Sequence, residues 1–274
     1  MRNESIQKTK VRIVLAGDEL EIYGYEDPLY FNFSADRRVV KARDLSNPFE
    51  NRERSRHRSH KMIRGIVDAN FGMHFDGFGR PYISKFLTLT YAENMTQPTN
   101  ADFTLFIKRL NYKLYKSKRS LLHYIAVIEF QKRGAVHYHI VIFNLPFMER
   151  DLYFSAFEEC WGHGFVKIRT VPDKGVGRYI TKNYITKADD FRLWGNKSYF
   201  TSRGLYRPIV IRQEIKAKNI LAILPDEACR WGNVFADEHT GLTEYKSYNL
   251  KDFPEIKARI LASLEKPATL KAIP

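Results

Sequence analysis

The alternation of apolar and polar residues predicts strands and helices in a definite order through the middle of the chain. Between Leu87 and Tyr91, apolar residues alternate with threonine, which is typical of a half-buried strand. Further on, after a helix cap at Thr99 or Asn100, apolar residues recur three to four positions apart. The expected elements are strand 85–91, helix 103–114, strands 123–130 and 136–143, helix 149–161, strand 165–168 and helix 176–187.

This order of elements predicts an α+β fold. A strand, a helix, two strands, a helix and a strand form the split βαβ arrangement, in which helices pack on an antiparallel sheet. We therefore expect a ferredoxin-like or RRM-like central sheet with flanking helices in residues 81–208. Residues 1–80 are expected to add strands and a basic helix, and residues 209–274 an appended subdomain with no chemistry of its own. The flanking elements expected are strands 11–15, 20–23 and 209–211, helices 212–221 and 254–264, and a hairpin around residues 239–241.

The charge of the chain indicates a polyanionic partner. The 274 residues include 45 Lys and Arg against 31 Asp and Glu, which gives a formal net charge of +14. Lys and Arg neutralise phosphates, so this excess favours nucleic acid. Many of the cations lie in the segment 51–71, which is either a solvated helix face or a helix that contacts phosphates. The residues expected to contact DNA are Arg52, Arg54, Arg56, Arg58, Lys61, Arg64 and, in a later turn, Arg133.

Other classes of protein are disfavoured. No apolar run approaches the roughly 18 residues of a membrane helix, and residues 1–10 are polar, unlike a signal peptide. The two cysteines, Cys160 and Cys229, fit buried thiols in a reducing compartment. The glycine cluster 175–177 lacks the Lys and Ser/Thr of a phosphate-binding loop. We therefore expect a cytoplasmic protein with no membrane partner and no helicase motor in this chain.

A candidate metal site lies in the two consecutive strands. His137 and His139 are two apart in a strand, so their imidazoles lie on one face. If residues 132–134 form a three-residue hairpin loop with Gly134 in the left-handed conformation, Glu129 lies opposite His137 on that same face. A two-residue loop would place it on the other face. Two imidazoles and a carboxylate suit a divalent cation, with imidazole favouring Mn²⁺ over Mg²⁺; the alternative is that the histidines are ordinary sheet residues.

A candidate nucleophile lies further along the chain. The tetrad Tyr-Ile-Thr-Lys occurs twice between Tyr179 and Lys187. Tyr and Lys three apart are neighbours on a helix, so each lysine can favour a tyrosinate or hold a phosphate beside it. A tyrosine hydroxyl can attack phosphorus and become a phosphotyrosine. The alternative is an amphipathic helix whose tyrosines pack on the sheet.

Together, three sequence elements resemble the motifs of the HUH endonucleases. The resemblance is to the rolling-circle replication initiators (Rep proteins) of small bacterial plasmids, single-stranded DNA phages and microviruses. Residues 86–91 resemble the first motif, residues 129–139 the second with its upstream acidic ligand, and residues 179–187 the third. The resemblance covers residues 85–208.

The resemblance implies a metal-dependent nuclease that nicks and rejoins one DNA strand. Glu129, His137 and His139 would hold Mn²⁺ or Mg²⁺, and the ion would polarise the scissile phosphate. A tyrosine would attack, leaving a 5′-phosphotyrosine link and a free 3′-OH that primes replication. The implied partners are single-stranded DNA at a replication origin and the helicase and polymerase of a bacterial host.

The third motif departs from the usual family pattern, in which two tyrosines lie four residues apart. Here Asn183 lengthens the gap to five residues. On an ideal helix the two hydroxyls then diverge by about 140° unless a bulge absorbs the extra residue. Residues 184–190 fit the plasmid-type pattern Tyr-x-x-Lys-x-x-Asp, which slightly favours Tyr184, with Lys187, as first nucleophile. Tyr179, with Lys182, is then the second nucleophile or a substitute.

Two other functions stay open on sequence alone. The first is a relaxase or a single-strand transposase of the same superfamily. Relaxases typically have a third metal histidine and a nucleophile near the N-terminus, and such transposases are usually shorter. The second is a non-catalytic protein that stacks single-stranded bases on a ferredoxin-like sheet with exposed aromatics. That function accounts for the charge but not for Glu129, His137 and His139 together with two Tyr-x-x-Lys tetrads.

Overall fold

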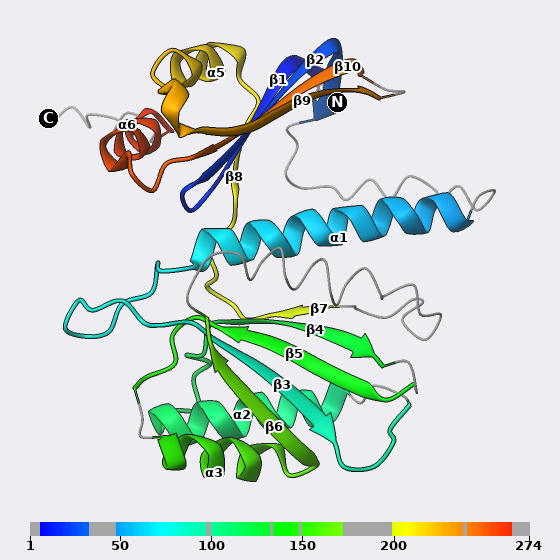
Figure 1. Ribbon diagram of the computed structural model, residues 1–274, viewed down its shortest axis with the longest axis vertical. Coiled ribbons are helices and arrows are strands. Elements are labelled where there is room, and N and C mark those ends of the chain that lie inside the picture. The colour runs from blue at the N-terminus through cyan, green and yellow to red at the C-terminus, as the bar shows by residue number, and fades with distance from the viewer. Residues whose placement is uncertain are drawn as a thin grey trace, which may run out of the picture. The chain divides into compact units, whose positions relative to one another are not determined.

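The chain forms two compact units in the computed structural model (Figure 1), and each is described by itself. Unit 1 comprises Met1–Ala42 and Pro208–Pro274, and unit 2 comprises Arg43–Arg207. The structure describes residues 6–32, 48–96, 100–131, 134–147, 150–171, 199–237 and 240–264. None of the helices in these described ranges is long and apolar enough to cross a membrane.

Unit 1 is a five-stranded antiparallel sheet with helices packed against it. The strand order is β8-β1-β2-β10-β9, so strands from both ends of the chain form one sheet. The apolar core lies between this sheet and the two helices. The expected strands 11–15 and 20–23 are much longer than the sequence pattern indicates. The elements are β1 (Ile6–Ala16), β2 (Glu19–Asn32), β8 (Ile209–Ile211), α5 (Glu214–Leu221), a 3₁₀ turn (Asp226–Ala228), β9 (Cys229–Asp237), β10 (Gly241–Asn249) and α6 (Pro254–Leu264).

Unit 2 confirms the predicted α+β class and the order of its six central elements. Its sheet has the order β6-β3-β5-β4-β7, and all neighbouring strands are antiparallel. Consequently β3 and β4 are parallel with β5 between them, and β5 and β6 are parallel with β3 between them. The expected helix 176–187 lies outside the described residues. The elements are α1 (Pro48–Asn70), β3 (Lys85–Tyr91), α2 (Asn100–Tyr115), β4 (Tyr124–Phe130), β5 (Val136–Ile142), α3 (Arg150–Trp161), β6 (Gly164–Thr170) and β7 (Tyr199–Thr201).

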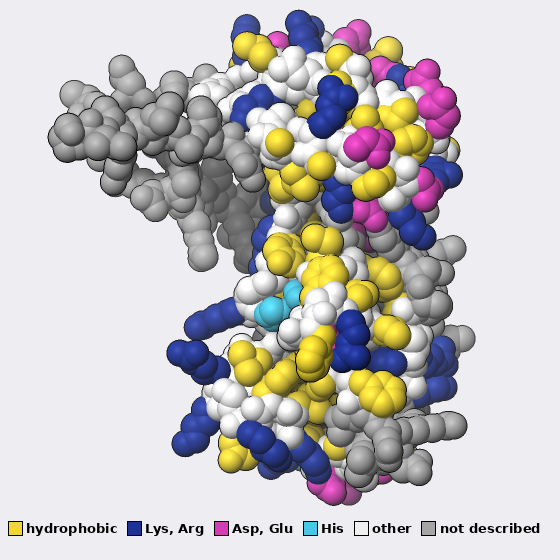
Figure 2. Space-filling view, turned by 90° about the vertical axis from the view of Figure 1, so that its left-hand side faces the viewer, with side chains coloured by type: hydrophobic (Ala, Val, Ile, Leu, Met, Phe, Trp, Pro, Cys, Tyr) yellow, Lys and Arg dark blue, Asp and Glu magenta, His cyan; other side chains and the backbone are white. Residues whose placement is uncertain are grey.

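The excess positive charge belongs almost entirely to unit 2. Unit 2 has 28 Lys and Arg against 15 Asp and Glu, a net charge of +13, whereas unit 1 has 17 against 16, a net charge of +1. In Figure 2 the acidic side chains accordingly gather in the upper part of the view, over unit 1. The polyanion that the composition predicts is therefore a partner for unit 2.

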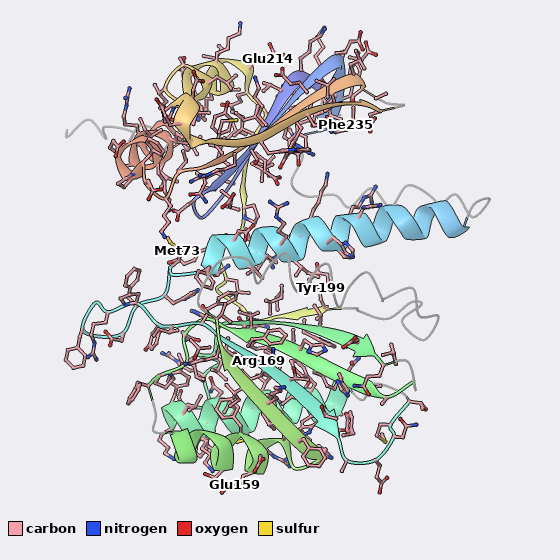
Figure 3. The ribbon with its side chains drawn as sticks, viewed as in Figure 1. Met73, Glu159, Arg169, Tyr199, Glu214 and Phe235 are labelled. Atoms are coloured by element: carbon pink, nitrogen blue, oxygen red, sulfur yellow. The ribbon has the colours of Figure 1, made fainter. Side chains whose placement is uncertain are left out.

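The two faces of the unit 2 sheet have different coverings. Leu87, Tyr138 and Ile140 pack against α2 and α3, which lie together on one side of the sheet (Figures 1 and 3). The alternate residues of the same strands, including Phe86 and Val141, pack against the C-terminal half of α1 on the other side. Because side chains alternate along a strand, the residues at 137 and 139 share the α1 side with Val141. Helix α1 therefore covers part of the face that carries the two histidines.

Two histidines that no sequence pattern brings together form a buried pair at the base of α1. Nδ1 of His123 lies 2.9 Å from Nδ1 of His74, whose Nε2 lies 3.0 Å from Oδ1 of Asn70. We expected both histidines to be isolated structural or surface residues, and for His74 and His123 that isolation is wrong. Burial, with a smaller contribution from His123, lowers the pKa of His74 to about 4. Burial also lowers the pKa of His123.

The His74 pair predicts that unit 2 loses stability in mild acid. An unfolded histidine has a pKa of about 6.5, so between that pH and about 4 the unfolded state binds a proton that buried His74 refuses. Stability is therefore complete above the unfolded pKa and falls as the pH drops through this window. We expect the free energy of unfolding to fall by about 2 kcal/mol from pH 7 to pH 5 on account of His74.

Urea unfolding at several pH values measures this loss. His74→Phe keeps an aromatic ring on Phe143, and Oδ1 of Asn70 still accepts the Tyr206 backbone N–H. This variant should show a shallower pH dependence, whereas His57→Phe, a change at an exposed position of α1, should keep the wild-type slope. Equal slopes for His74→Phe and the wild type would show that His74 does not titrate in this window.

Candidate metal centre

The hairpin between β4 and β5 has the register that the metal site requires. Glu129 pairs with His137 and Phe130 with Val136. The turn closes with the N–H of Gln131 donating to the carbonyl of Ala135, and Gly134 has a left-handed φ of +89°. The conditional prediction of a three-residue loop is thus confirmed, because Glu129 and both histidines lie on one face of the sheet.

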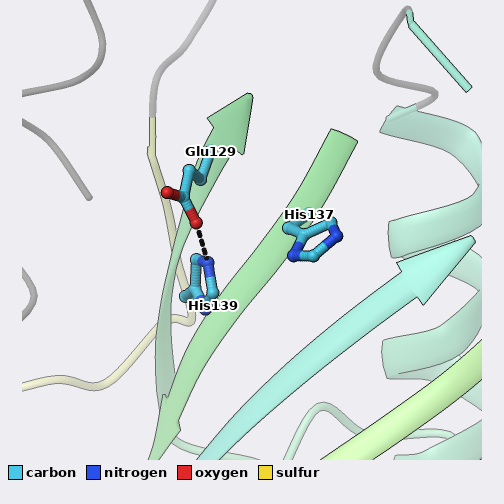
Figure 4. A group of neighbouring side chains, drawn as sticks. All are labelled: Glu129, His137 and His139. Carbon is cyan, nitrogen blue, oxygen red and sulfur yellow. Dashed lines mark hydrogen bonds and ion pairs between the residues drawn. The ribbon is translucent and has the colours of Figure 1, made fainter. Parts of the chain in front are cut away.

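The three side chains meet in a compact buried cluster (Figure 4). One ligand atom from each of Glu129, His137 and His139 lies within 4.8 Å of the others. Nε2 of His139 is 2.7 Å from Oε2 of Glu129. Buried carboxylates and imidazoles in this proximity need compensation for lost hydration, and a bound cation supplies it.

Neighbouring side chains orient the two imidazoles. Oγ1 of Thr88 lies 3.1 Å from Nδ1 of His139, and the ring of Phe86 stacks on that imidazole with centroids 5.7 Å apart. The side-chain amide of Gln131 lies 3.5 Å from Nδ1 of His137. A hydroxyl and an amide can each donate or accept, so they serve either tautomer of the histidine they contact. With Nδ1 protonated, Nε2 presents its lone pair to an ion.

The donor set fits a divalent metal ion. Two imidazole nitrogens and one carboxylate oxygen make three ligands and leave coordination positions for other oxygens. Among the described residues, this is the one group of at least three His, Cys, Asp or Glu with such proximity. The cluster of Glu129, His137 and His139 could therefore hold a metal ion.

The sheet face beside the cluster carries exposed cations and an exposed ring that sequence reasoning did not single out. Thr88 pairs with His139 on one side and with Lys167 of β6 on the other. Phe165 and Arg169 flank Lys167 on the same face of this edge strand, and Arg169 is labelled in Figure 3. Both cations are exposed, as is 70% of Phe165. The alternation of residues 165–169 was visible in the sequence, but the position of β6 next to β3 was not.

The other candidate residues are only partly described. Tyr179, Lys182, Tyr184, Lys187 and Arg133 lie outside the described residues. In α1 the side chains are described from residue 57 onward: Arg58 and Lys61 are exposed, whereas Arg64 lies 3.6 Å from the carboxylate of Asp68. The side chains of Arg52, Arg54 and Arg56 are not described, although α1 includes these positions.

The comparison with protein families confirms the resemblance to replication initiators. Residues 84–189 match the model of a family described as replication-associated protein ORF2. This segment includes the metal cluster and all three sequence motifs. It is a minority of the chain.

A curated protein supports the same relationship. The chain is similar to the Phasyl DNA replicon protein arp of Escherichia coli, with 29% identity. The alignment covers 39% of this chain and 44% of that protein, so the chain spans less than half the length of this relative. No solved structure matches the chain significantly.

Proposed function

We propose that this chain, whose residues 84–189 match replication-associated proteins, nicks and rejoins single-stranded DNA at a replication origin and thereby starts rolling-circle replication. The observation that carries the proposal is the buried cluster of Glu129, His137 and His139 inside the matched segment. A protein that only bound single strands would have no use for three converging metal ligands beneath a strongly basic surface. The family match supports a role in replication initiation independently of the nuclease chemistry.

In this proposal, Glu129, His137 and His139 hold Mn²⁺ or Mg²⁺. When bound, the ion polarises the scissile phosphate and neutralises the charge that develops on it. Thr88 and Gln131 fix the tautomers of the two imidazoles, and the Phe86 ring limits rotation of His139. These contacts keep the ligand atoms together before DNA binds, which lowers the cost of assembling the site.

The DNA strand is proposed to reach the cluster over the adjacent edge of the sheet. Lys167 and Arg169 are suited to phosphate contacts, and the exposed ring of Phe165 to a base. The exposed Arg58 and Lys61 of α1, with the other cations of the basic segment and Arg133, are proposed to contact phosphates further away. All of these residues belong to the unit with the net charge of +13.

The proposed nucleophiles are the two tyrosines of the third motif. The hydroxyl oxygen of Tyr184 attacks phosphorus, and the bond to the 3′-oxygen breaks. The products are a 5′-phosphotyrosine and a free 3′-OH. Tyr179 takes the second transfer, and Lys182 and Lys187 stabilise the negative charge beside each ring. Extension of the 3′-OH would need a polymerase and a helicase from the host, and we propose the bacterial cytoplasm as the location.

Incubation with single-stranded origin DNA tests the proposed function. With Mn²⁺ we expect one cleavage site, protein attached to the 5′ end of the released strand, and a free 3′-OH on the other fragment. EDTA should stop cleavage but leave binding, because dispersed cations supply the affinity. Tight binding without cleavage in Mn²⁺ or Mg²⁺ would contradict the proposal and favour a non-catalytic single-strand binder.

The basic helix should contribute to affinity through phosphate contacts alone. Changing Arg58 and Lys61 together to Gln should reduce the slope of log K against log salt by about two, near one unit per lost contact. Cleavage at saturating DNA should persist. A matched pair of exposed cations in unit 1, Lys218 and Arg259, changed to Gln should leave the slope unaltered. An unchanged slope in the Arg58 and Lys61 variant would identify this part of α1 as a solvated face.

A further inference from the structure

A small hairpin between α1 and β3 projects from unit 2 with an aromatic residue at its tip. We call residues 74–82 the tip hairpin. Tyr82 donates its backbone N–H to the carbonyl of His74, Phe75 pairs with Pro81, and the backbone N–H of Asp76 donates to the carbonyl of Arg80. Figure 1 shows this cyan loop extending beyond the sheet, at the end away from the arrowhead of β4. The tip hairpin is thus a paired structure with a defined direction.

Asp76 holds the tip in one conformation. Its Oδ1 accepts the backbone N–H groups of Phe78 and Arg80, each at 2.9 Å, and its Oδ2 accepts Nε–H of Arg80 at 2.8 Å. Gly79 has a left-handed φ of +78°, which a glycine adopts without strain. The position of Phe78 is therefore imposed by the turn.

This turn holds Phe78 in solvent beside a cation. The side chain of Phe78 is 85% exposed, and Phe75 beneath it is 55% exposed. The Arg80 guanidinium carbon lies 5.1 Å from the centre of the Phe78 ring. An aromatic ring beside a guanidinium offers a nucleobase a stacking surface and its phosphate a positive charge.

The surroundings of the tip hairpin select the partner. It belongs to the unit with 28 cations and 15 acids, and the hairpin's own acid, Asp76, is bonded within the turn. Figure 2, which faces the side from which the hairpin projects, shows hydrophobic side chains interspersed with Lys and Arg over unit 2 and few acidic ones. A polyanion with exposed aromatic faces is complementary to this surface, and single-stranded nucleic acid has both properties.

We propose that the tip hairpin is a second contact for single-stranded DNA, in which Phe78, backed by Arg80, stacks on an unpaired base. The contact lies at the opposite end of the sheet from the metal cluster, because Lys85 pairs with Ile142 whereas Thr90 pairs with His137. It therefore holds the strand several nucleotides from the scissile phosphate. The inference rests on the proposed function only in taking single-stranded DNA as the partner.

Fluorescence anisotropy in EDTA tests this contact without cleavage. Wild type and Phe78→Ala are titrated with three labelled DNAs: a single strand, the same strand with abasic sites throughout, and its duplex. Phe78→Ala should bind the base-bearing strand about 5- to 100-fold more weakly, the range for one lost base stack. Phe78→Trp should restore it. The abasic strand and the duplex should show no difference between wild type and Phe78→Ala, because neither offers an unstacked base.

Phe147→Ala is the matched control, since Phe147 is another phenylalanine of unit 2 and is 94% exposed; it should bind like wild type. Unchanged binding of the base-bearing strand by Phe78→Ala would overturn the inference alone, leaving the proposed function intact. A loss that is equal on the abasic strand, or that Phe78→Trp does not restore, would also overturn it. If wild type itself fails to bind the single strand, both the inference and the proposed function fall.

Discussion

His139→Ala is expected to reduce origin-strand cleavage in Mn²⁺ by at least about 100-fold, because it removes one of three ligands to the ion that activates the scissile phosphate. The same change removes the group that lies 2.7 Å from Glu129, so Mn²⁺ affinity should fall as well. Cleavage kinetics measure the first effect, and calorimetric titration of the protein with Mn²⁺ measures the second. Single-strand affinity in EDTA should stay near that of the wild type, since it depends on dispersed cations.

His163→Ala provides the control for this result. His163 is a histidine of the same unit, but its ring contacts Trp161 and Asp102 instead of the cluster. It should cleave and bind Mn²⁺ normally. Thr88→Val, which removes the hydroxyl beside Nδ1 of His139, should weaken Mn²⁺ binding by roughly 10-fold or more. Wild-type cleavage by His139→Ala in Mn²⁺ would refute the metal-site proposal.

Tyr184→Phe should lose most of the first nicking reaction, whereas Tyr179→Phe should keep nicking and lose part of strand transfer. Phenylalanine preserves ring packing, so each loss is assignable to the hydroxyl. The covalent DNA adduct is measured by denaturing gel and located by mass spectrometry of the linked peptide. The double variant should form no adduct. Tyr112→Phe, a change at an exposed tyrosine of α2, should behave like wild type.

Two results would change the assignment of the nucleophile. If Tyr179→Phe alone abolishes the adduct, Tyr179 is the first nucleophile and the turn containing Asn183 brings it to the metal. If the double variant still forms an adduct, the nucleophile lies outside this motif. The five-residue spacing makes equal behaviour of the two single variants unexpected, because the two hydroxyls diverge on an ideal helix.

The metal cluster was predictable because its geometry depends on local chain properties. Residues two apart in a strand share a face, and Gly134 indicated the loop length that sets the register. From these two facts, Glu129, His137 and His139 could be brought together without knowledge of the rest of the fold. The order of strands and helices in unit 2 was readable for the same reason, from periodicity within short segments.

Features that depend on distant pairing were not predictable in this way. The sequence pattern showed Lys167 and Arg169 alternating in a strand, but only the pairing of β6 with β3 places them beside the cluster. His74 and His123 lie on segments that no periodicity relates, and their contact is visible only in the packed structure. Likewise, strands 11–15 and 20–23 extend to Ile6–Ala16 and Glu19–Asn32 because β8 and β10 lie beside them.

The sheet of unit 1 also has a consequence for synthesis on the ribosome. Its first two strands end at Asn32, while their partners β8 and β10 begin at Ile209 and Gly241. At about 5–20 residues per second, the N-terminal hairpin waits roughly 10–35 s for β8 and longer for β10. All of unit 2 emerges during that interval as one continuous segment. Unit 2 therefore folds first, and the N-terminal hairpin has two open edges that a nascent-chain chaperone must shield from other polypeptides.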